Sequence, residues 1–547
     1  METVINWKDA IDKPMWRTTA GVCPTAHAAG RNLVYDKRNH GDYRNETIFQ
    51  WDTVTTMNRY FTPNDAWVPG LAFTTNSGAI GAGAYAFFMP SHGPNGVVGA
   101  SPTTTKVTLA ALPNSGTVGI NQLANCGGRK GFVLRVIDVG AGLSGKIEER
   151  EIVANTAGTT PTVTLDSALT FTPTASTTRY EMLSGRIYNL GSGTTASGFF
   201  RAFDLASETN SAALTNTNLP ATIGTDTTSV ELDEQYVPYN RNPGEGMLVG
   251  SATYDANGPW PKFCLTATAI AAGTITGQAS GGDASVIENE YAKMFQIRIV
   301  EDTVTPAAVG QRRKITSHTA GASPVYTLVS NWTTTPSANC KYVIELNNDV
   351  MLWTGTNAVT YSYAAGGFAA DANWSTAAAA GGATQYANPG SANGAGCMAC
   401  SAFSIVPDVS KNALQGHVFK WRGGASVTLE LYNHITNTWS TIVPGQAMST
   451  TLSTATCGVH DPVSNEGRYF TFSPNVTQNT YRFDMLTRTY KGWAYLRVAQ
   501  SGTAAVGQRM AWVMYDDGGN ERDRVRVGVI YLQTHLGTTF FDTVVIR

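Results

Sequence analysis

The sequence predicts an all-β protein built from repeated hairpins, with helix confined to short turns. Composition is the first indication: only 14% of the 547 residues are charged, and abundant Gly, Thr, Ser and Asn favour short strands and turns. Two further indications are a hairpin pattern that recurs along the chain and a Thr-rich segment that occurs twice. The length predicts roughly two to four domains rather than one core.

Charge and hydropathy exclude several classes of protein. The net charge of −2 gives no basic surface of the kind that binds nucleic acid. The first residues, METVINWKDAIDKP, lack the basic and apolar regions of a secretory signal. The apolar runs are too short to cross a bilayer. We therefore expect a soluble chain that is synthesised in a cytoplasm and has no membrane span.

The cysteines predict neither disulfides nor a metal site. Seven are scattered along the chain, at Cys23, Cys126, Cys264, Cys340, Cys397, Cys400 and Cys457. An odd, irregular set is typical of buried free thiols in a reducing compartment. Cys397 and Cys400 form a single CxxC, and no second pair follows at the spacing that zinc requires. We expect no metal and no cofactor.

The Thr-rich segment is repeated in register at a distance of 163 residues. REIVANTAGTTPTVTLDSALTFTP occupies 150–173 and RKITSHTAGASPVYTLVSNWTTTP occupies 313–336; between 132–175 and 295–338, 15 of 44 positions are identical. Both copies read as alternating strands. The repeat predicts one small β unit formed twice, with Phe132 and Phe295 in matching buried positions and Arg135 and Arg298 on the opposite face. Residues 493–509 resemble part of a third copy.

A hairpin pattern recurs between these copies. An aromatic residue followed by Asp or Asn ends a strand at Trp51-Asp52, Phe203-Asp204, Tyr432-Asn433 and Phe483-Asp484. The Asp or Asn side chain caps the following turn through the backbone, and aromatic residues such as Tyr60, Trp439 and Trp493 pack across the sheet. Residues 360–374 are a looser fifth example. The pattern predicts equivalent hairpins in radially arranged sheets; the alternative is four unrelated hairpins.

This hairpin pattern resembles that of Kelch-type β-propellers, in which aromatic–Asp–x–x–Thr–x–x–Trp marks each blade. Gly423-Gly424 matches the glycine pair of that family. The resemblance implies a Kelch-like β-propeller of roughly six or seven blades, with the Thr-rich units inserted. The predicted divisions are N-terminal blades and loops (1–131), the first inserted unit (132–183), further blades (184–294), the second inserted unit (295–346), and C-terminal blades with closing strands (347–547).

The Thr-rich unit resembles a segment that recurs in structural proteins of tailed bacteriophages, most closely over 150–182. The resemblance implies a virion protein. Propellers of the nozzle or tail-hub type form sixfold rings below the portal in short-tailed phages. The resemblance therefore implies that the partners are other copies of the same chain and the adaptor, portal and tail-fibre proteins, with DNA only as passing cargo. It also implies a location in the tail after synthesis in the host cytoplasm.

No catalytic residues are predicted, and we expect the protein not to be an enzyme. The boxes of sialidases and the Tyr, Cys and His cluster of a Kelch-type copper oxidase are absent from the sequence. His27, His92 and His460 stand singly in predicted turns, where histidine is usually solvated or a cap. The acidic residues Asp516, Asp517, Glu521 and Asp523 surround Gly518-Gly519, a pattern typical of a hairpin turn rather than a calcium loop.

Two hypotheses of function remain. The first is a ring-forming structural protein of the phage tail; the alternative is a propeller at the tail tip or capsid surface that binds or cleaves glycans. A glycan-cleaving site would need paired carboxylates beside aromatic residues, and no such pair stands out. We further predict that 75–106, 205–230 and 364–396 are polar loops, mobile in the isolated chain and ordered by contacts in the particle.

Overall fold

The computed structural model describes most of the chain. The described residues are 17–24, 33–35, 47–51, 56–62, 65–72, 84–89, 92–110, 112, 116–124, 131–139, 144–194, 200–211, 213–214, 216, 218–231, 263–277, 288, 295–346, 349–363, 374, 386–401, 417–424, 426–433, 436–445, 452–454, 456–461, 469–473, 479–495, 504–516, 526–535 and 542–546. In this part the structure is almost wholly β, and helix is confined to short turns such as Pro306–Ala308. None of its helices is long and apolar enough to span a membrane.

Six antiparallel sheets form the blades of a β-propeller, which confirms the predicted fold class. Blade 1 comprises β2 (Leu33–Tyr35), β3 (Thr47–Trp51), β4 (Thr56–Phe61) and β5 (Ala66–Ala72). Blade 2 comprises β6 (Tyr85–Met89), β13 (Arg186–Leu190), β15 (Phe200–Asp204) and β16 (Thr209–Asn210). Blade 3 comprises β18 (Thr228–Glu231), β26 (Val350–Trp353) and β27 (Tyr361–Tyr363).

The C-terminal third supplies the other three blades, apart from one strand that comes from the N-terminal segment. Blade 4 comprises β28 (Met398–Ser401), β29 (Val418–Gly423), β30 (Ser426–Asn433) and β31 (Thr438–Ile442). Blade 5 comprises β32 (Cys457–Asp461), β33 (Tyr469–Ser473), β34 (Asn479–Asp484) and β35 (Thr489–Tyr495). Blade 6 comprises β36 (Ala504–Asp516), β37 (Arg526–His535), β38 (Asp542–Ile546) and β1 (Arg17–Thr18). A separate pair, β14 (Gly193–Thr194) and β17 (Thr222–Ile223), connects blades 2 and 3.

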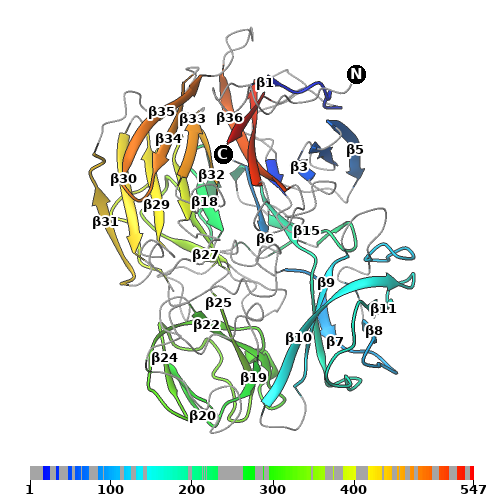
Figure 1. The fold of residues 1–547 in the computed structure, drawn as a ribbon. Helices are drawn as coiled ribbons and strands as arrows, with labels where there is room; N and C mark the ends of the chain where they lie inside the picture. Colours follow the sequence, from blue (N-terminus) through cyan, green and yellow to red (C-terminus); the bar gives the residue numbers. More distant parts are fainter. Residues whose placement is uncertain are drawn as a thin grey trace.

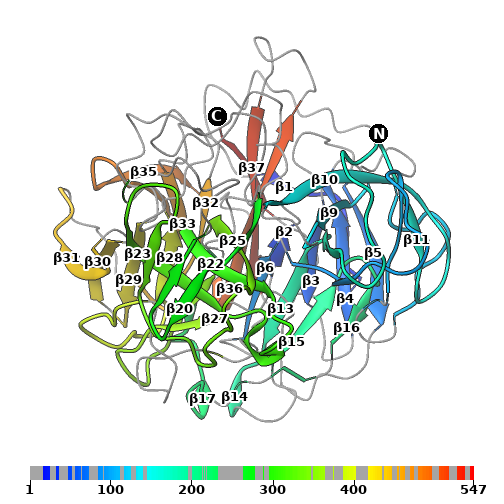
Figure 2. The same cartoon turned by 90° about the horizontal axis from the view of Figure 1, so that it is seen from below.

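The ring of blades is closed by strands from both ends of the chain. The first strands of the blades follow one another around the ring in the order β2, β6, β18, β28, β32 and β36, and β36 lies beside β2 again. Blade 6 takes its fourth strand from the N-terminal segment, because β1 pairs with β38. The closure therefore consists of backbone hydrogen bonds rather than a covalent link. Figure 2 shows the blades arranged around this centre.

The turn between the third and fourth strands of a blade confirms most of the predicted hairpin pattern. Asp204 Oδ1 accepts hydrogen bonds from two backbone N–H groups, at 3.0 and 3.1 Å. Asp484 Oδ1 makes the same pair at 3.0 and 3.1 Å, and Asn433 Oδ1 accepts one at 3.2 Å. The residue before each fourth strand has positive φ, at Glu208, Asn437 and Arg488; these three hairpins are therefore equivalent.

The prediction for Trp51-Asp52 was wrong. Trp51 ends the second strand of blade 1 rather than the third, and Asp52 lies outside the described residues. The equivalent turn follows Tyr60, whose hydroxyl donates to Asp65 Oδ1 at 2.6 Å. In blade 4, the Tyr432 hydroxyl donates in the same way to Asn437 Oδ1 at 2.7 Å. A side chain at the other end of the turn thus holds blade 1, and the aromatic–Asp pair alone misidentified the strand.

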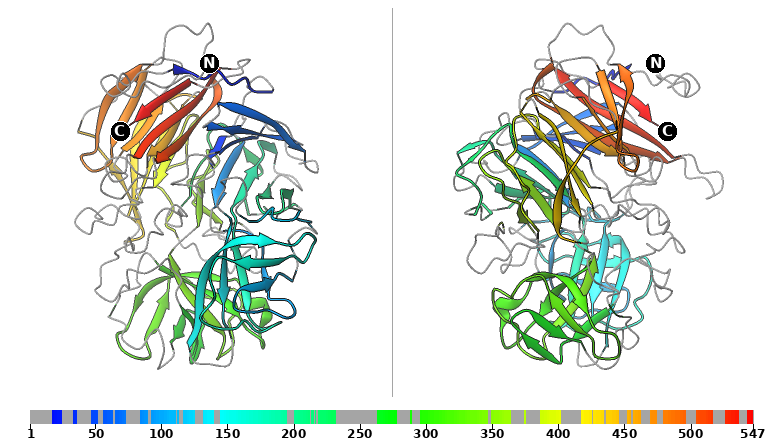
Figure 3. Two further views of the ribbon diagram at one scale, coloured as in Figure 1. Left: turned by 45° about the vertical axis from the view of Figure 1, so that its right-hand side comes forward. Right: turned by 90° about the vertical axis from the view of Figure 1, so that its left-hand side faces the viewer.

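Two small β units, one of six strands and one of seven, are inserted into neighbouring blades. Unit 1 comprises β7 (Asn95–Val97), β8 (Lys106–Thr108), β9 (Val133–Ile137), β10 (Ser144–Asn155), β11 (Thr162–Leu165) and β12 (Arg179–Leu183). Unit 2 comprises β19 (Phe263–Thr266), β20 (Ala269–Ala271), β21 (Thr274–Thr276), β22 (Phe295–Glu301), β23 (Arg312–His318), β24 (Val325–Leu328) and β25 (Lys341–Leu346). The units lie below the blades in Figure 1 and remain separate from them in both views of Figure 3.

The two units have the same strand order. Unit 1 runs β7-β12-β9-β10-β11-β8, and unit 2 runs β19-β25-β22-β23-β24-β21. Each sheet curls until its ends meet: Val98 bridges Leu109 in unit 1, and β20, which continues β19, pairs with β21 in unit 2. Each unit is therefore a small barrel around its own apolar core, and we call the two units barrel 1 and barrel 2.

The repeated Thr-rich sequence forms the same turn in both barrels. Thr156 Oγ1 accepts from the backbone N–H of Thr162 at 2.9 Å, and Thr319 Oγ1 accepts from that of Val325 at 2.9 Å. The glycine two residues after each of these threonines has positive φ, 123° and 100°, where residues with a Cβ are strained. The shared threonine and glycine are thus required by the hairpin that joins the second and third strands of each repeat.

The predicted division of faces is also confirmed. Phe295 is completely buried in the core of barrel 2, and Phe132 packs, partly buried, against the core of barrel 1. Leu134 and Val136 face the same core. Arg135 lies between these two residues on β9, so its side chain points to the outside of barrel 1. Arg298 lies between Ile297 and Ile299 on β22 and points to the outside of barrel 2 in the same way.

The barrels begin earlier in the sequence than the repeat suggests. Residues 95–108 and 263–276, assigned above to blades, pair with the strands of barrels 1 and 2. The segments 75–106 and 205–230 are correspondingly not loops throughout, since they contain β6, β7, β16 and β17 and the beginnings of β8 and β18. Of 364–396, residues 364–373 and 375–385 lie outside the described residues. The described parts of 493–509 belong to blades rather than to a third unit, since 493–495 lie in β35 of blade 5 and 504–509 lie in β36 of blade 6.

Both barrels leave the propeller at the same kind of connection. Barrel 1 is inserted between the first and second strands of blade 2, and barrel 2 between the first and second strands of blade 3. Corresponding connections emerge on the same face of a propeller. Neighbouring blades therefore place the barrels side by side on one face, which brings β9 and β22 toward each other.

Candidate functional site

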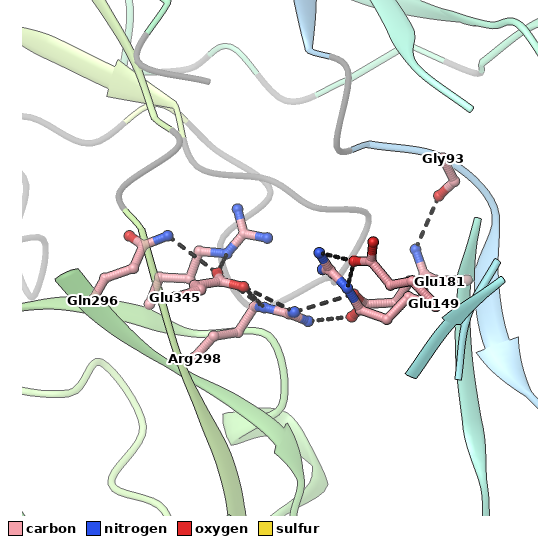
Figure 4. A network of polar contacts seen from close by, with 9 residues as sticks. Gly93, Glu149, Glu181, Gln296, Arg298 and Glu345 are labelled. Carbon is pink, nitrogen blue, oxygen red and sulfur yellow. Dashed lines mark hydrogen bonds and ion pairs between the residues drawn. The ribbon is translucent and has the colours of Figure 1, made fainter. Parts of the chain in front are cut away.

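The two barrels meet along a junction that joins backbone, apolar and charged contacts. Strand β10 of barrel 1 pairs with β19 of barrel 2, with Gly145 opposite Cys264. Next to this pairing, Ile137 from barrel 1 packs with Val300 and Val343 from barrel 2. Beside the apolar cluster lies a chain of buried ion pairs, shown in Figure 4. We call these ion pairs the junction network.

The barrel 1 half of the network is centred on Arg135. Its guanidinium is 2.8 Å from Glu149 Oε1 and 3.0 Å from Glu181 Oε2. Glu149 lies opposite Arg135 on β10, and Glu181 lies opposite it on β12. Antiparallel pairing on both sides of β9 thus places the arginine between two carboxylates, and all three side chains are largely buried.

The barrel 2 half is centred on Glu345. Arg298 Nη2 lies 3.0 Å from Glu345 Oε2, and Arg312 Nε lies 3.4 Å from its Oε1. Gln296 Nε2 also donates to Glu345 Oε1, at 3.1 Å. The halves are joined because Arg298 bonds Glu181 of barrel 1 through Nη1 and, at 3.2 Å, through Nη2. Figure 4 shows this crossing from one barrel to the other.

Neither barrel is neutral in this network, but the pair is. Barrel 1 contributes one arginine and two glutamates, and barrel 2 contributes two arginines and one glutamate. The imbalance arises at equivalent positions, since Glu149 and Arg312 are 163 residues apart and each lies opposite the central arginine of its barrel. In barrel 2 this places Arg312 directly opposite Arg298, and Glu345 compensates both. The duplication has diverged into two complementary halves.

The network holds its charges fixed at neutral pH. Burial alone would raise the pKa of Glu181, but Arg298 and Arg135 outweigh it and hold the pKa at about 2. Burial would lower the pKa of Arg298, but Glu181 and Glu345 raise it above its ordinary value. Groups whose pKa lies this far from neutral pH are unsuited to general acid–base catalysis. The arrangement can hold two bodies together, and it is poorly suited to move protons.

A second polar cluster attaches barrel 1 to blade 2. His92 lies in the connection from β6 into the barrel, is buried, and has Nδ1 2.6 Å from the Tyr188 hydroxyl. Beside it, Arg186 Nε donates to Asp204 Oδ2 at 2.9 Å. Burial lowers the pKa of His92 well below its ordinary value, and Arg312, Arg186 and Arg298 lower it further. His92 is therefore neutral and structural, not the solvated turn residue that the sequence suggested.

The other sequence candidates do not come together. His460 lies within β32 rather than in a turn, and His27 lies outside the described residues. Cys397 and Cys400 are buried, with Cys400 Sγ 3.7 Å from Met485 Sδ. Across the ranges given above, no three His, Cys, Asp or Glu side chains are grouped so that they could hold a metal ion.

The strands on either side of the acidic segment pair with each other in antiparallel fashion. Asp516 ends β36 opposite Arg526 at the start of β37. Asp517, Glu521 and Asp523 lie between these two strands in the sequence, outside the described residues. The segment thus joins two strands of blade 6.

Sequence reasoning identified both arginines at the centre of the network but missed its carboxylates. Glu181 and Glu345 are not at equivalent positions, because Glu181 pairs with Arg135 whereas Glu345 pairs with Gln296. An alignment of the copies therefore gives no shared acidic position. The signal that was present is the opposite charge at Glu149 and Arg312.

Comparison with known proteins identifies no family. No family model matches the chain, and no curated protein does. Among solved structures, it is weakly similar to phage phi92 endosialidase, at 8% identity over 97% of this chain and 68% of that one, with a TM-score of 0.30. The NanB sialidase of Streptococcus pneumoniae gives 8% identity over 85% and 94%, with a TM-score of 0.22. The α-L-arabinofuranosidase Arb93A of Fusarium graminearum gives 10% over 66% and 89%, with a TM-score of 0.21. Scores this low establish neither common ancestry nor a shared activity.

Proposed function

We propose that this chain is a structural component of a tailed-bacteriophage tail, in which a propeller carries two barrels as one rigid contact module. The observation that supports the proposal is the junction network. Arg298 bonds a carboxylate from each barrel, and all three side chains are largely buried. Breaking a buried pair by removing one partner costs about 3–5 kcal/mol. Barrels joined in this way keep a fixed orientation relative to each other, which a surface that contacts neighbouring tail proteins requires.

The location of the Thr-rich repeat supports the same proposal. The segment 150–182 that resembles phage structural proteins runs through three strands and the turns of barrel 1. Its threonines stabilise the backbone of the hairpin through hydrogen bonds, as Thr156 Oγ1 does by accepting from the N–H of Thr162. The resemblance therefore concerns a folding unit, which is the part of a protein that an assembly module would preserve.

The finer part of the proposal is a closed ring of copies at a hub or nozzle below the portal, beside adaptor and fibre proteins. Ring closure needs two different patches on each subunit, in head-to-tail contact. The barrel pair is attached to blades 2 and 3 only, so opposite sides of the subunit differ. Such asymmetry suits a ring and does not by itself give the number of copies.

A propeller that binds or cleaves glycans at the tail tip is the second candidate. It is favoured by the topology, because both barrels leave from connections between first and second strands. In an antiparallel blade successive connections alternate between the two faces, so the connections from the second to the third strand and from one blade to the next emerge on the face opposite the barrels. An axial ligand site could therefore be present there without interference from the barrels.

The proposal is tested on purified particles of a phage that encodes this chain. Antibodies against the isolated chain should label the tail, and quantitative mass spectrometry should find several copies per particle. Absence from washed particles would overturn the proposal. The isolated chain should also release no sugar from a panel of bacterial surface glycans; release by the purified protein, abolished by denaturation, would favour the second candidate.

A further inference from the structure

A buried amine, carboxamide and carboxylate meet between blades 3 and 4. Lys420 on β29 is completely buried, and its Nζ donates to Asn393 Oδ1 at 3.0 Å. Glu430 Oε2 on β30 lies 2.7 Å from the same Nζ. Asn393 and Glu430 are 8% and 3% exposed. Three groups of this kind, out of water and within hydrogen-bond distance, can react with one another.

The surroundings of Lys420 are apolar and aromatic. Its Nζ lies 5.9 Å from the Trp353 ring centroid and 5.4 Å from that of Trp439. Burial lowers the pKa of the lysine, although Glu430 opposes this effect. An amine becomes nucleophilic only when it is neutral, and a buried carboxylate at 2.7 Å can accept the proton that must leave.

The carboxamide is held in place by its backbone. Asn393 N–H donates to the carbonyl of Thr354 at 3.2 Å, and the next residue, Gly394, donates to that of Arg422 at 2.7 Å. The segment packs so closely on the β29–β30 turn that a Cβ at Gly423 would lie 2.5 Å from Cys397 N. Asn393 Nδ2 is buried and has no hydrogen-bond partner within the described residues. A nucleophile that attacks Cγ of Asn393 would displace Nδ2, and Nδ2 is the atom that has no hydrogen bond from the described part of the chain holding it in place.

We propose that Lys420 and Asn393 join in an intramolecular isopeptide bond, with Glu430 as the group that transfers protons. Glu430 takes a proton from the lysine ammonium, and the lone pair of Nζ then attacks Cγ of Asn393. The Cγ–Nδ2 bond breaks, and protons carried by Glu430 pass to the departing nitrogen. The products are a secondary amide and one ammonium ion, so charge and atoms balance, Glu430 is regenerated, and no oxidant is required.

Arg422 positions the carboxylate for this step. Its Nη2 lies 3.0 Å from Glu430 Oε1, which leaves Oε2 directed at Lys420. The bond would tie the connection that enters blade 4 to the second strand of that blade, across 27 residues. It goes beyond the proposed function and does not depend on it.

The intact mass of the purified full-length chain tests the proposal. The expected mass is lower than that of the sequence by one ammonia, and a protease digest should contain a branched peptide that joins residues 393 and 420. Lys420→Arg and Glu430→Gln should restore the full mass. Lys341→Arg is the matched control, because Lys341 Nζ faces the Thr266 hydroxyl at 2.7 Å; this variant should still lose ammonia.

A competing reaction must be separated from the proposed one. Asn393 precedes Gly394, and a succinimide at that step would also release ammonia. A succinimide would form equally in Lys420→Arg and would be cleaved by hydroxylamine, whereas the isopeptide would be absent from that variant and would resist hydroxylamine in the wild type. The full sequence mass in folded wild-type protein, or ammonia loss that persists in Lys420→Arg, would overturn the proposal.

Discussion

At the scale of single residues, the structure relies on charged and polar side chains that are removed from water. His92 and Glu181 are the clearest examples, because burial acts on both and arginines decide the outcome in opposite directions. Around His92 the arginines add to the effect of burial and favour the neutral imidazole. Around Glu181 they overcome burial and favour the carboxylate. Both effects make stability depend on pH.

His92 should make the protein less stable below pH 6.5. Its pKa in the folded state is lower than the ordinary value of 6.5, so its contribution is fully present above that pH and is lost as the pH falls toward the folded pKa. The slope from this one group approaches about 1.4 kcal/mol per pH unit. Urea denaturation between pH 7.5 and 5 should show a smaller slope in His92→Asn, and equal slopes would contradict the prediction.

Glu181 should contribute to stability at a lower range of pH. Its pKa falls from 4.5 to about 2 on folding. Stability from this group is therefore present above pH 4.5 and is lost as the pH falls toward 2, by about 3 kcal/mol in total. Glu181→Gln should be destabilised at pH 7 and should approach the wild type as the pH falls from 4.5. A constant difference between the two proteins across this range would be inconsistent with the junction network.

At the scale of elements, the turn between the third and fourth strands of each blade is a repeated device with replaceable parts. Asp204, Asn433 and Asp484 bond the turn from its start, whereas Asp65 acts from its end. The geometry of the turn is the same in these blades, but the side chain that stabilises it comes from different positions in the turn. This is why the sequence pattern identified three hairpins correctly and assigned the fourth to the wrong strand.

Removal of one turn carboxylate should have a local and moderate effect. Asp484→Ala leaves the N–H groups of Leu486 and Thr487 without their acceptor, and the loss of hydrogen bonds to a charged group costs about 1.5–3 kcal/mol. Asp484→Asn keeps an acceptor and should recover most of this loss. Thermal denaturation of both variants tests the prediction; equal loss in the two would show that charge, not the hydrogen bonds, matters.

At the scale of the whole molecule, much of the architecture followed from the sequence and some could not. The 163-residue period predicted two copies of one unit because turn residues such as Thr156 and Thr319 recur in register. The full barrels were not predictable, since β7 and β19 share little sequence and are recruited by pairing alone. The junction network could not be predicted from the sequence, because side chains from the two barrels come into contact only after folding.

The closure of the ring should depend on the short strand β1. Removal of residues 1–18 deletes β1, which pairs with β38, and leaves β38 as an open edge strand. The unfolding temperature should fall, and the truncated protein should associate more readily at high concentration. Removal of residues 1–16, which spares β1, is the matched control. Indistinguishable calorimetric scans for the two truncations would contradict closure by β1.

The two barrels are held as one body by buried charges that are balanced only when both barrels are in contact. A double-mutant cycle across the junction tests it most directly, with Glu181→Ala, Arg298→Ala and the double variant compared by urea denaturation at pH 7. The two side chains belong to different barrels, so the account predicts a coupling energy of about 1–3 kcal/mol. Single-variant effects that add within about 0.3 kcal/mol would show that the barrels are energetically independent and would contradict the account.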